Sequence, residues 1–380
     1  MSYATPLAFC TTLLASAYTF AAPGFAPAAT IPKGDWPDHS SALCDVAHET
    51  GAYLARGQAY DPAAIHGGTY KAGRVPAERI RDTLAFICAV HDEDSSRGQT
   101  SRLVDPTFIE QHFDLVKWHP DQAGAAALSD AKPLLQKLPA DKLLLTKYYV
   151  RLAEGSPGQT TSKPHALYGL PHDEAGLSLS VADARKDTIT RYAHGKQRII
   201  ELEKNADSAG HLARLAPPLV WLNRADLEGA LLQGTAVVND EDGRRRYFNV
   251  HRNNGVAYDR TRKPEEQERY WYFKEVPGVL GYGKDADYKI PVKPLVTVAG
   301  DIFQLGLGRL ILLRTEEAGK PVLRLTVLAD TGGAFHDNLY QLDWLSGYYH
   351  GWEDYHAANR HRGDYAQAWL LLKKESVPSR

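Results

Sequence analysis

Two aspartates near the C-terminal end carry the most distinctive chemistry in this sequence. Asp330 ends an apolar run and is followed by Thr331-Gly332-Gly333, where the backbone must turn tightly or approach another group closely. Asp343 lies between Leu342 and Trp344. A carboxyl group in apolar surroundings is desolvated, which raises its pKa and suits it to donate a proton. The alternative, that both aspartates only accept hydrogen bonds from turn amides, is the one that composition alone favours.

Motifs for other kinds of chemistry are absent from the sequence. It has no phosphate-binding loop, no G-x-S-x-G elbow and no paired cysteines at metal-ligand spacing. The GLGRL segment at Gly306 and Gly308 lacks the third glycine of a dinucleotide site. Four histidines follow one another closely, but their spacing fits no usual set of metal ligands, so we expect surface histidines, no metal and no cofactor. They are His336, His350, His356 and His361.

The two halves of the chain have different periodicity. Up to about Pro139 the pattern predicts helices, for example over 76–90 and over 105–118, where Phe108, Ile109 and Phe113 recur at helical spacing. From Leu143 onward, short apolar runs alternate with Gly, Asn and Asp turns, which predicts strands of a barrel or sandwich. One helix, over about 181–205, interrupts this pattern. We read the stretch LEGALLQGTAVV after it as strand.

The N-terminal residues resemble an export signal. The chain is apolar from Pro6 to Ala22, and within this stretch the small-x-small pattern Ala15-Ser16-Ala17 comes after the run PLAFCTTLL. The run is too short to span a bilayer, so we expect residues 1–22 to be removed, Cys10 with them. In an exported chain the remaining Cys44 and Cys88 can pair in a disulfide, and two separate buried thiols are the alternative.

The net charge of −2 gives no reason to expect a nucleic-acid partner. Recognition should therefore depend on local polar and aromatic groups. The sequence holds seven Trp and twenty Tyr, and aromatic rings of this kind stack well on sugar faces.

The sequence around the aspartates resembles the MltA-type lytic murein transglycosylases and their three-aspartate domain. DTGGAF at Asp330 is similar to that family's DTGGAI or DVGGAI. The family's catalytic aspartate is the first residue of its motif D-x-[FY]-x-G. Asp343 and Gly347 have the same spacing as the aspartate and glycine of that motif. TVAGDIFQLGLG places Asp301 seven residues before Gly308, as the family does.

Upstream motifs extend the resemblance in the same order, over about 108–373. The family's T-G-Y-Y, Y-P-[LI]-Y-x-x-P, Q-G-S-G, K-N-G-H-[AP]-Y and S-Y-V-F-F-[RK] resemble segments that begin at Thr146, His165, Gln233, Asn253 and Arg269.

Three departures from the family pattern matter. The segment between Asp330 and Asp343 is two residues longer than usual and has Asp337 where the family has glycine, so Asp337 is a rival acid. Lys147 and Ala236 replace two other glycines. Where the family has a long helical stretch before the last upstream motif, this sequence has only DRTRKPEEQER. One wall of the family's substrate groove should therefore be shorter here.

The resemblance implies a mainly β fold with N-terminal helices. A double-psi β-barrel is built from the N- and C-terminal parts, 33–152 and 286–375, and a second β-rich domain is inserted over 153–275. The groove between them would bind peptidoglycan strands. The enzyme would cut these strands between N-acetylmuramic acid and N-acetylglucosamine. The products would carry 1,6-anhydro ends.

The resemblance also assigns roles. Asp343 would be the catalytic acid and base, with Asp330 beside it, and Thr146, Gln233, Asn254 and Asp301 would bind substrate. For Thr146, Gln233 and Asn254 the alternative is a hydrogen bond within a turn or the barrel. We expect an exported monomer of the periplasm or cell envelope that is at most peripheral to the membrane. Two alternatives remain open: a peptidoglycan-binding protein that no longer cuts, and a glycoside hydrolase that uses water.

Overall fold

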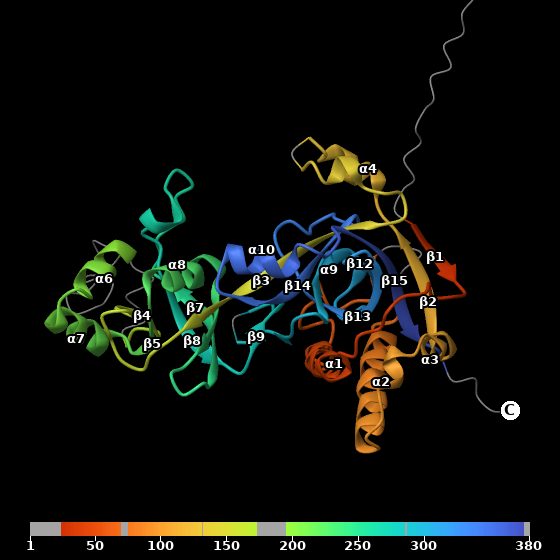
Figure 1. Ribbon diagram of the computed structural model, residues 1–380, viewed down its shortest axis with the longest axis horizontal. Helices are drawn as coiled ribbons and strands as arrows, with labels where there is room; N and C mark the ends of the chain where they lie inside the picture. Colours follow the sequence, from red (N-terminus) through yellow and green to blue (C-terminus); the bar gives the residue numbers. More distant parts are fainter. Residues whose placement is uncertain (1–23, 70–74, 131, 173–194, 286, 376–380) are drawn as a thin grey trace, which may run out of the picture.

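The computed structural model describes residues 24–69, 75–130, 132–172, 195–285 and 287–375. The expected export signal at 1–22 lies outside this part of the chain. Figure 1 shows two lobes: a smaller one at the left, with elements from β4 to β8, and a larger one at the right with most of the remaining chain. In the described residues no helix is long and apolar enough to cross a membrane.

The larger lobe is a closed barrel of six strands. Its hydrogen-bonded order is β15-β12-β13-β11-β14-β3, and a pairing of β15 with β3 closes the ring. Two of the pairs, β11 with β13 and β14 with β3, are parallel, and the others are antiparallel. The six strands are β3 (Leu143–Glu154), β11 (Thr297–Ala299), β12 (Leu310–Glu317), β13 (Lys320–Asp330), β14 (Gln341–Tyr349) and β15 (Tyr365–Lys373).

The barrel confirms the expected mainly β fold class with N-terminal helices. Strand β3 of the barrel comes from the N-terminal half of the chain, and the other five strands come from the C-terminal half. The double-psi crossing of the strands stays a prediction. Along these strands apolar residues fill the interior, with Leu143, Leu145, Val298, Ile311 and Leu328 almost inaccessible to solvent.

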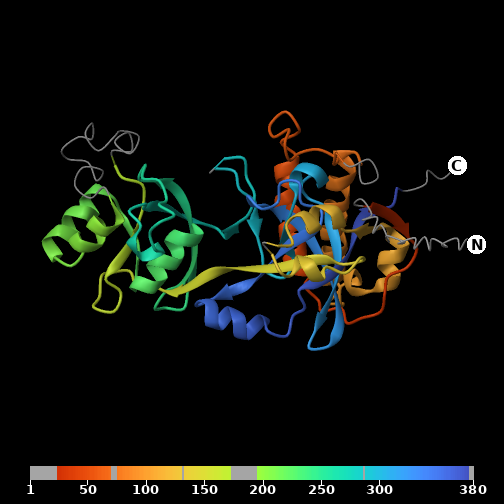
Figure 2. The same cartoon turned by 90° about the horizontal axis from the view of Figure 1, so that it is seen from above.

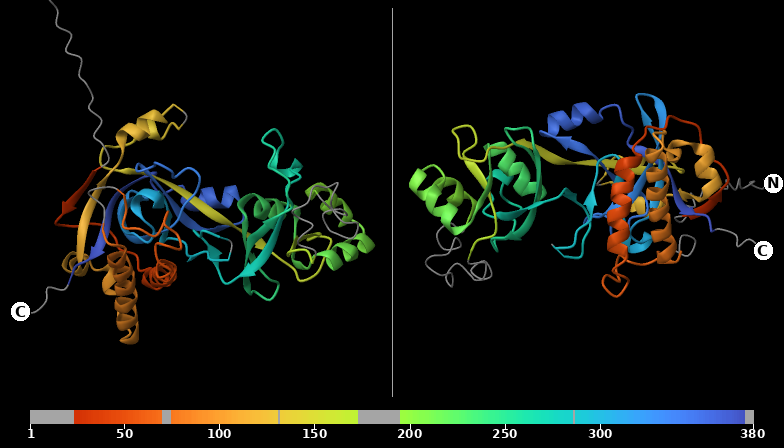
Figure 3. Two further views of the ribbon diagram at one scale, coloured as in Figure 1. Left: turned by 180° about the vertical axis from the view of Figure 1, so that it is seen from behind. Right: turned by 90° about the horizontal axis from the view of Figure 1, so that it is seen from below.

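Helices α1 (Ser40–Leu54) and α2 (Ala77–Ser96) lie side by side against the barrel (Figure 3). Their apolar faces join the barrel core through Leu43, Val46, Ile80, Leu84 and Ile87. Two edge strands extend the sheet beyond β15 and short helices lie around the rim. These elements are β1 (Gly24–Ala28), β2 (Phe113–His119), η1 (Arg102–Val104), α3 (Pro106–His112), α4 (Gln122–Ala127), η2 (Leu135–Lys137), α9 (Ile302–Leu305) and α10 (Trp352–Asn359).

The smaller lobe has its own core around Leu167, Val220, Phe248 and Tyr270. Strand β3 runs from the barrel into this lobe, where its last four residues pair with β6 (Figure 2). Because one strand belongs to both sheets, it ties the two lobes together. The lobe contains β4 (His165–Tyr168), α6 (Lys196–Leu202), α7 (Ala206–Leu215), β5 (Pro218–Leu222), α8 (Arg224–Gln233), β6 (Thr235–Asn239), β7 (Arg245–Asn253), η4 (Pro264–Glu266) and β8 (Trp271–Val276); β9 (Val279–Leu280) and β10 (Pro291–Val292) lead back to the barrel.

Two sequence-based assignments are wrong. The helix expected over 105–118 ends at His112, and Phe113 begins strand β2, because the alternating side chains of 113–119 pair with β15. The stretch read as strand before Gly234 is helix α8, which Asn223 caps by accepting a hydrogen bond from the Asp226 amide. Most of the helix expected over 181–205 lies outside the described residues, and α6 occupies part of the remainder.

Candidate functional site

Asp330 and Asp343 are placed in one row across the barrel wall. Asp330 ends β13 and pairs with Ala299 of β11, and Ala299 pairs on its other side with Asp343 of β14. Asp343 in turn pairs with Thr146 of β3. Strand β3 of the N-terminal half and strands β11, β13 and β14 of the C-terminal half therefore bring two carboxyl groups and a hydroxyl group together.

Asp330 is held by two hydrogen bonds. The Tyr148 hydroxyl donates to its Oδ2 at 2.8 Å, and the Thr331 amide donates to its Oδ1 at 2.9 Å. Burial raises the pKa of Asp330 to about 6, although these donors and the charge of Lys289 oppose the rise. Both carboxyl oxygens already accept hydrogen bonds, so this group is the better stabilised carboxylate of the two.

The carboxyl group of Asp343 makes fewer hydrogen bonds than that of Asp330. Its Oδ1 is buried and has no hydrogen-bond partner among the described residues. Burial raises the pKa of Asp343 to about 6, and the nearby charge of Asp330 adds to the rise, while Thr146 and Lys147 oppose it. A carboxyl group with an unused oxygen and a raised pKa is suited to hold a proton and to pass it to a bound molecule.

The surroundings of Thr146 fix this part of the row. Gln341 Nε2 donates to the Thr146 hydroxyl at 2.9 Å, and that hydroxyl donates to the Leu342 carbonyl at 3.3 Å. Lys147 Nζ donates to Asp364 at 2.8 Å and is almost buried, so its charge stays near Asp343.

A cleft of about 440 Å³ opens beside the row, between the barrel and the smaller lobe. Asp330, Tyr148 and Lys147 line it from the barrel, and Gln233 and Thr235 line it from the smaller lobe. Strand β9 and helix α10 complete it through Val279, Leu280, Trp352 and Tyr355. This volume is that of a small-molecule site, and clefts between lobes are a usual place for one.

Gln233 lies in this cleft, as the sequence resemblance implied, and its Oε1 accepts a hydrogen bond from the Arg151 amide at 2.6 Å. Its amide nitrogen is the group of Gln233 that remains for a ligand. Helix α8 places it there because Gly234 ends that helix in the left-handed conformation, φ 75°.

Two other expected substrate-binding residues are not accessible to a ligand. Asp301 is 0% exposed and accepts from the Gln304 amide and side chain and from the Asn338 amide, at 2.9, 3.1 and 3.0 Å. Asn254 is 1% exposed and bonds to the Glu268 carbonyl and the Tyr270 amide. Both therefore hold loops, and the expectation that they contact substrate directly is corrected.

The rival acid Asp337 is in a different environment from Asp343. Its side chain is 82% exposed, bonds to Gln304 Nε2 at 3.2 Å and lies 3.2 Å from the His336 ring. Its backbone has φ 54°, a conformation that glycine adopts without strain. Unlike Asp330, Asp337 does not line the cleft beside the row.

Sequence reasoning assigned no site role to the four aromatic residues of the cleft, which are Tyr148, Tyr149, Trp352 and Tyr355. Tyr148 holds Asp330, and Trp352 and Tyr355 of α10 line the wall. Tyr148 was within the quoted T-K-Y-Y segment, so its position beside the aspartates could have been expected. Trp352 gave no signal, because a single aromatic residue after a turn has no periodicity.

Solved structures with this arrangement of strands are known. The chain is similar to the lytic transglycosylase LtgG of Burkholderia pseudomallei, with 18% identity, a TM-score of 0.51 and 94% and 97% of the two chains covered. It is similar to Escherichia coli MltA with bound chitohexaose, with 15% identity, a TM-score of 0.53 and the same coverage. It is also similar to MltA from Neisseria gonorrhoeae, with 15% identity, a TM-score of 0.53 and 90% and 91% of the two chains covered. No curated protein sequence matches.

Residues 144–263 match the model of the MltA specific insert domain. This chain has the MltA fold with its insert. The resemblance found in the sequence is thereby confirmed. The match begins within β3, covers β6 and β7, and ends at Lys263, within the short 259–269 segment. Most of the smaller lobe therefore matches the MltA insert.

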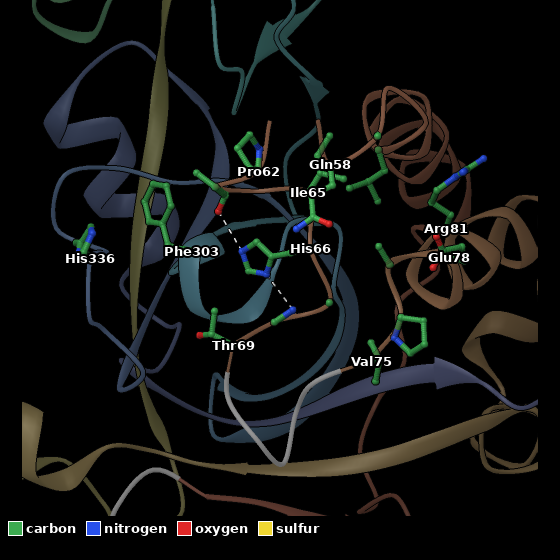
Figure 4. Close-up of a pocket in the computed structure, with 17 residues that line it drawn as sticks. Gln58, Pro62, Ile65, His66, Thr69, Val75, Glu78, Arg81, Phe303 and His336 are labelled. Atoms are coloured by element: carbon green, nitrogen blue, oxygen red, sulfur yellow. Dashed lines mark hydrogen bonds between the residues drawn. The ribbon is translucent and has the colours of Figure 1, made fainter. Parts of the chain in front are cut away.

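A second, larger cavity lies elsewhere in the described part of this MltA-fold chain. It has a volume of about 910 Å³ and lies between α1, α2 and α9, lined by His66, Phe303, Arg81 and His336 (Figure 4). It shares no lining residue with the cleft at Asp330. His66 is fixed within it, because Nδ1 accepts from the Gly68 amide and Nε2 contacts the Ala63 carbonyl.

Cys44 of α1 and Cys88 of α2 are joined by a disulfide bond in this structure. Within the described ranges no group of three or more His, Cys, Asp or Glu side chains could hold a metal ion. His350, His356 and His336 lie at the surface, and His361 contacts Arg360.

Proposed function

We propose that this protein is a lytic murein transglycosylase that cuts the β-1,4 bond between N-acetylmuramic acid and N-acetylglucosamine and forms 1,6-anhydro ends. The observation that carries the proposal is the unpartnered, buried Oδ1 of Asp343, next to a cleft between the barrel and the MltA insert. The bound chitohexaose named for the E. coli MltA structure supports a glycan substrate.

One carboxyl group is sufficient for this reaction. Protonated Asp343 gives its proton to the glycosidic oxygen as the bond to C1 breaks and an oxocarbenium-like centre forms. The resulting carboxylate then takes the proton of the muramoyl C6 hydroxyl, whose oxygen closes onto C1. No water is consumed, and the intramolecular attack has the advantage of proximity.

Asp330 has a supporting role in this proposal. It ionises first because Tyr148 and Thr331 donate hydrogen bonds to it, and its charge then disfavours ionisation of Asp343. Gln233 and Thr146 are proposed to bind sugar hydroxyl or acetamido groups.

A glycoside hydrolase is the second candidate, and Asp330 is the observation that favours it, since a second carboxylate beside the cleft is what ordinary glycosidases use. A binding protein that no longer cuts is favoured by the short 259–269 segment of the insert.

Digestion of purified peptidoglycan in H₂¹⁸O separates these three functions by mass. A transglycosylase releases muropeptides that lack one water and carry no ¹⁸O. A hydrolase releases reducing ends that carry ¹⁸O, and a binding protein releases nothing.

We further propose that the protein is exported to the periplasm as a monomer and is at most peripheral to the membrane. The Cys44–Cys88 disulfide supports an oxidising compartment.

A further inference from the structure

Helix α10 presents an unusual surface residue to the cleft. Trp352 is the most exposed large hydrophobic side chain in the described residues, at 66%, and it lines the cleft together with Asp330 and Tyr355. One turn further along the helix, His356 stacks on its ring, with centroids 5.5 Å apart and planes at 15°. His356 therefore covers one part of the ring, and the exposed remainder is open to a ligand.

The position of Trp352 is fixed by the aromatic residue between the helix and the barrel. Tyr355 contacts the Trp352 ring at 5.5 Å and stacks on Tyr149 of β3 at 4.8 Å and 22°. Its hydroxyl donates to the Lys147 carbonyl at 2.9 Å. Tyr349 of β14 closes the cluster through edge contacts to Tyr149 and Tyr355 at 5.8 Å.

These contacts connect Trp352 to the strands that carry the aspartate row. Tyr149 and Lys147 follow Thr146 on β3, and Tyr349 lies on the same strand as Asp343. An exposed aromatic ring costs free energy in water, and a ring that is already ordered loses little entropy when a ligand covers it. A flat apolar ligand face is the chemistry that such a surface fits.

We propose that Trp352 is a stacking platform for one N-acetylhexosamine ring of the glycan, and that it sets affinity in the cleft beside Asp343. This inference rests on the proposed function, because it assumes that the cleft takes a glycan strand. The C–H face of a pyranose ring covers the open face of the indole, and Gln233 of the insert lies across the same cleft to bond its polar substituents.

The test uses chitohexaose and isothermal titration calorimetry in an Asp343→Asn background, where no cutting disturbs the equilibrium. Adding Trp352→Ala should weaken binding roughly tenfold, the scale of one aromatic stacking contact. Trp352→Phe should recover most of the affinity because a flat ring is retained. Leu128→Ala, at an exposed apolar residue that ends α4 and lies outside the cleft lining, should leave binding unchanged.

Equal affinity of the parent and Trp352→Ala would overturn the platform while leaving the proposed function in place. Equal losses for Trp352→Ala and Leu128→Ala would also overturn it, because the effect would then be unspecific. Absence of chitohexaose binding by the parent overturns the platform, and the muropeptide masses then show separately whether the proposed function fails too.

Discussion

Asp330 and Asp343 face the same residue, Ala299, from the strands on its two sides. Adjacent strands are about 4.8 Å apart. Because β11 lies between β13 and β14, the two aspartates are two strand spacings apart in the same row. Each has a pKa raised to about 6 by burial, but only Asp330 has both oxygens hydrogen bonded. The arrangement therefore favours one ionised and one protonated carboxyl group at a pH near 6.

The first prediction is a pH dependence. If Asp343 must be protonated to start the reaction, activity should fall as the pH rises through about 6, by up to tenfold per pH unit. Replacing Lys147 with Met removes a positive charge that lowers the pKa of Asp343, so the falling limb should move to higher pH. The profile of kcat/KM against pH for both proteins measures this shift.

Lys320→Met is the matched control, since this exposed lysine begins β13 at the far end of the strand from Asp330. A limb that moves equally in both variants, or moves to lower pH in Lys147→Met, would show that Lys147 does not act on the catalytic carboxyl group.

The second prediction concerns stability. A carboxyl group whose pKa is higher in the folded than in the unfolded protein destabilises the fold above that folded pKa and has no effect below the unfolded pKa of about 4. Asp343→Asn should therefore raise the free energy of unfolding by about 1–3 kcal/mol at pH 8 and by little at pH 4. Urea unfolding at the two pH values measures it, with exposed Asp337→Asn as the control. The same difference at both pH values would rule out this cause.

The third prediction separates loop support from substrate contact. Asp301→Ala should destabilise the protein by about 1–3 kcal/mol, because it leaves the buried amides of Gln304 and Asn338 without their acceptor. Thermal unfolding of Asp301→Ala beside Asp337→Ala provides the measurement. Unchanged stability of Asp301→Ala together with weaker glycan binding would restore a direct substrate role for Asp301.

The fourth prediction concerns the disulfide. In the exported protein Cys44 and Cys88 should be protected from alkylation unless a reductant is added. Replacing both with Ser should cost roughly 4 kcal/mol by the loop-entropy model, because α1 and α2 would no longer be linked in the unfolded chain. Mass spectrometry after alkylation checks the pairing. Two alkylated thiols without reductant would mean that the pair does not form.

The sequence predicted those parts of the fold whose local pattern agrees with their tertiary environment. The apolar run before Asp330 is a barrel strand, and the periodic segment at Ile80 is a helix. Phe113 was misassigned because its spacing fits a helix, and only pairing with β15, which no local pattern reveals, makes it a strand residue.

The candidate site was predictable to a similar extent. Short motifs identified Asp330 and Gln233, which line the cleft, and Asp343, which lies in the same row of strand residues as Asp330. They did not distinguish residues that face the cleft from Asp301 and Asn254, which hold loops inside the protein. Burial depends on strand register and loop packing, and a motif written in residue types contains neither.

The central claim is that Asp343 transfers the proton, and the most direct measurement is the rate at which variants release anhydromuropeptides from purified peptidoglycan. Asp343→Asn should lower kcat by about ten-thousand-fold, the upper range for general acid and base catalysis, while glycan binding persists. Asp337→Asn should retain nearly full activity, because that side chain is solvated at the surface. An inactive Asp337→Asn beside an Asp343→Asn that still releases anhydro ends would contradict the account.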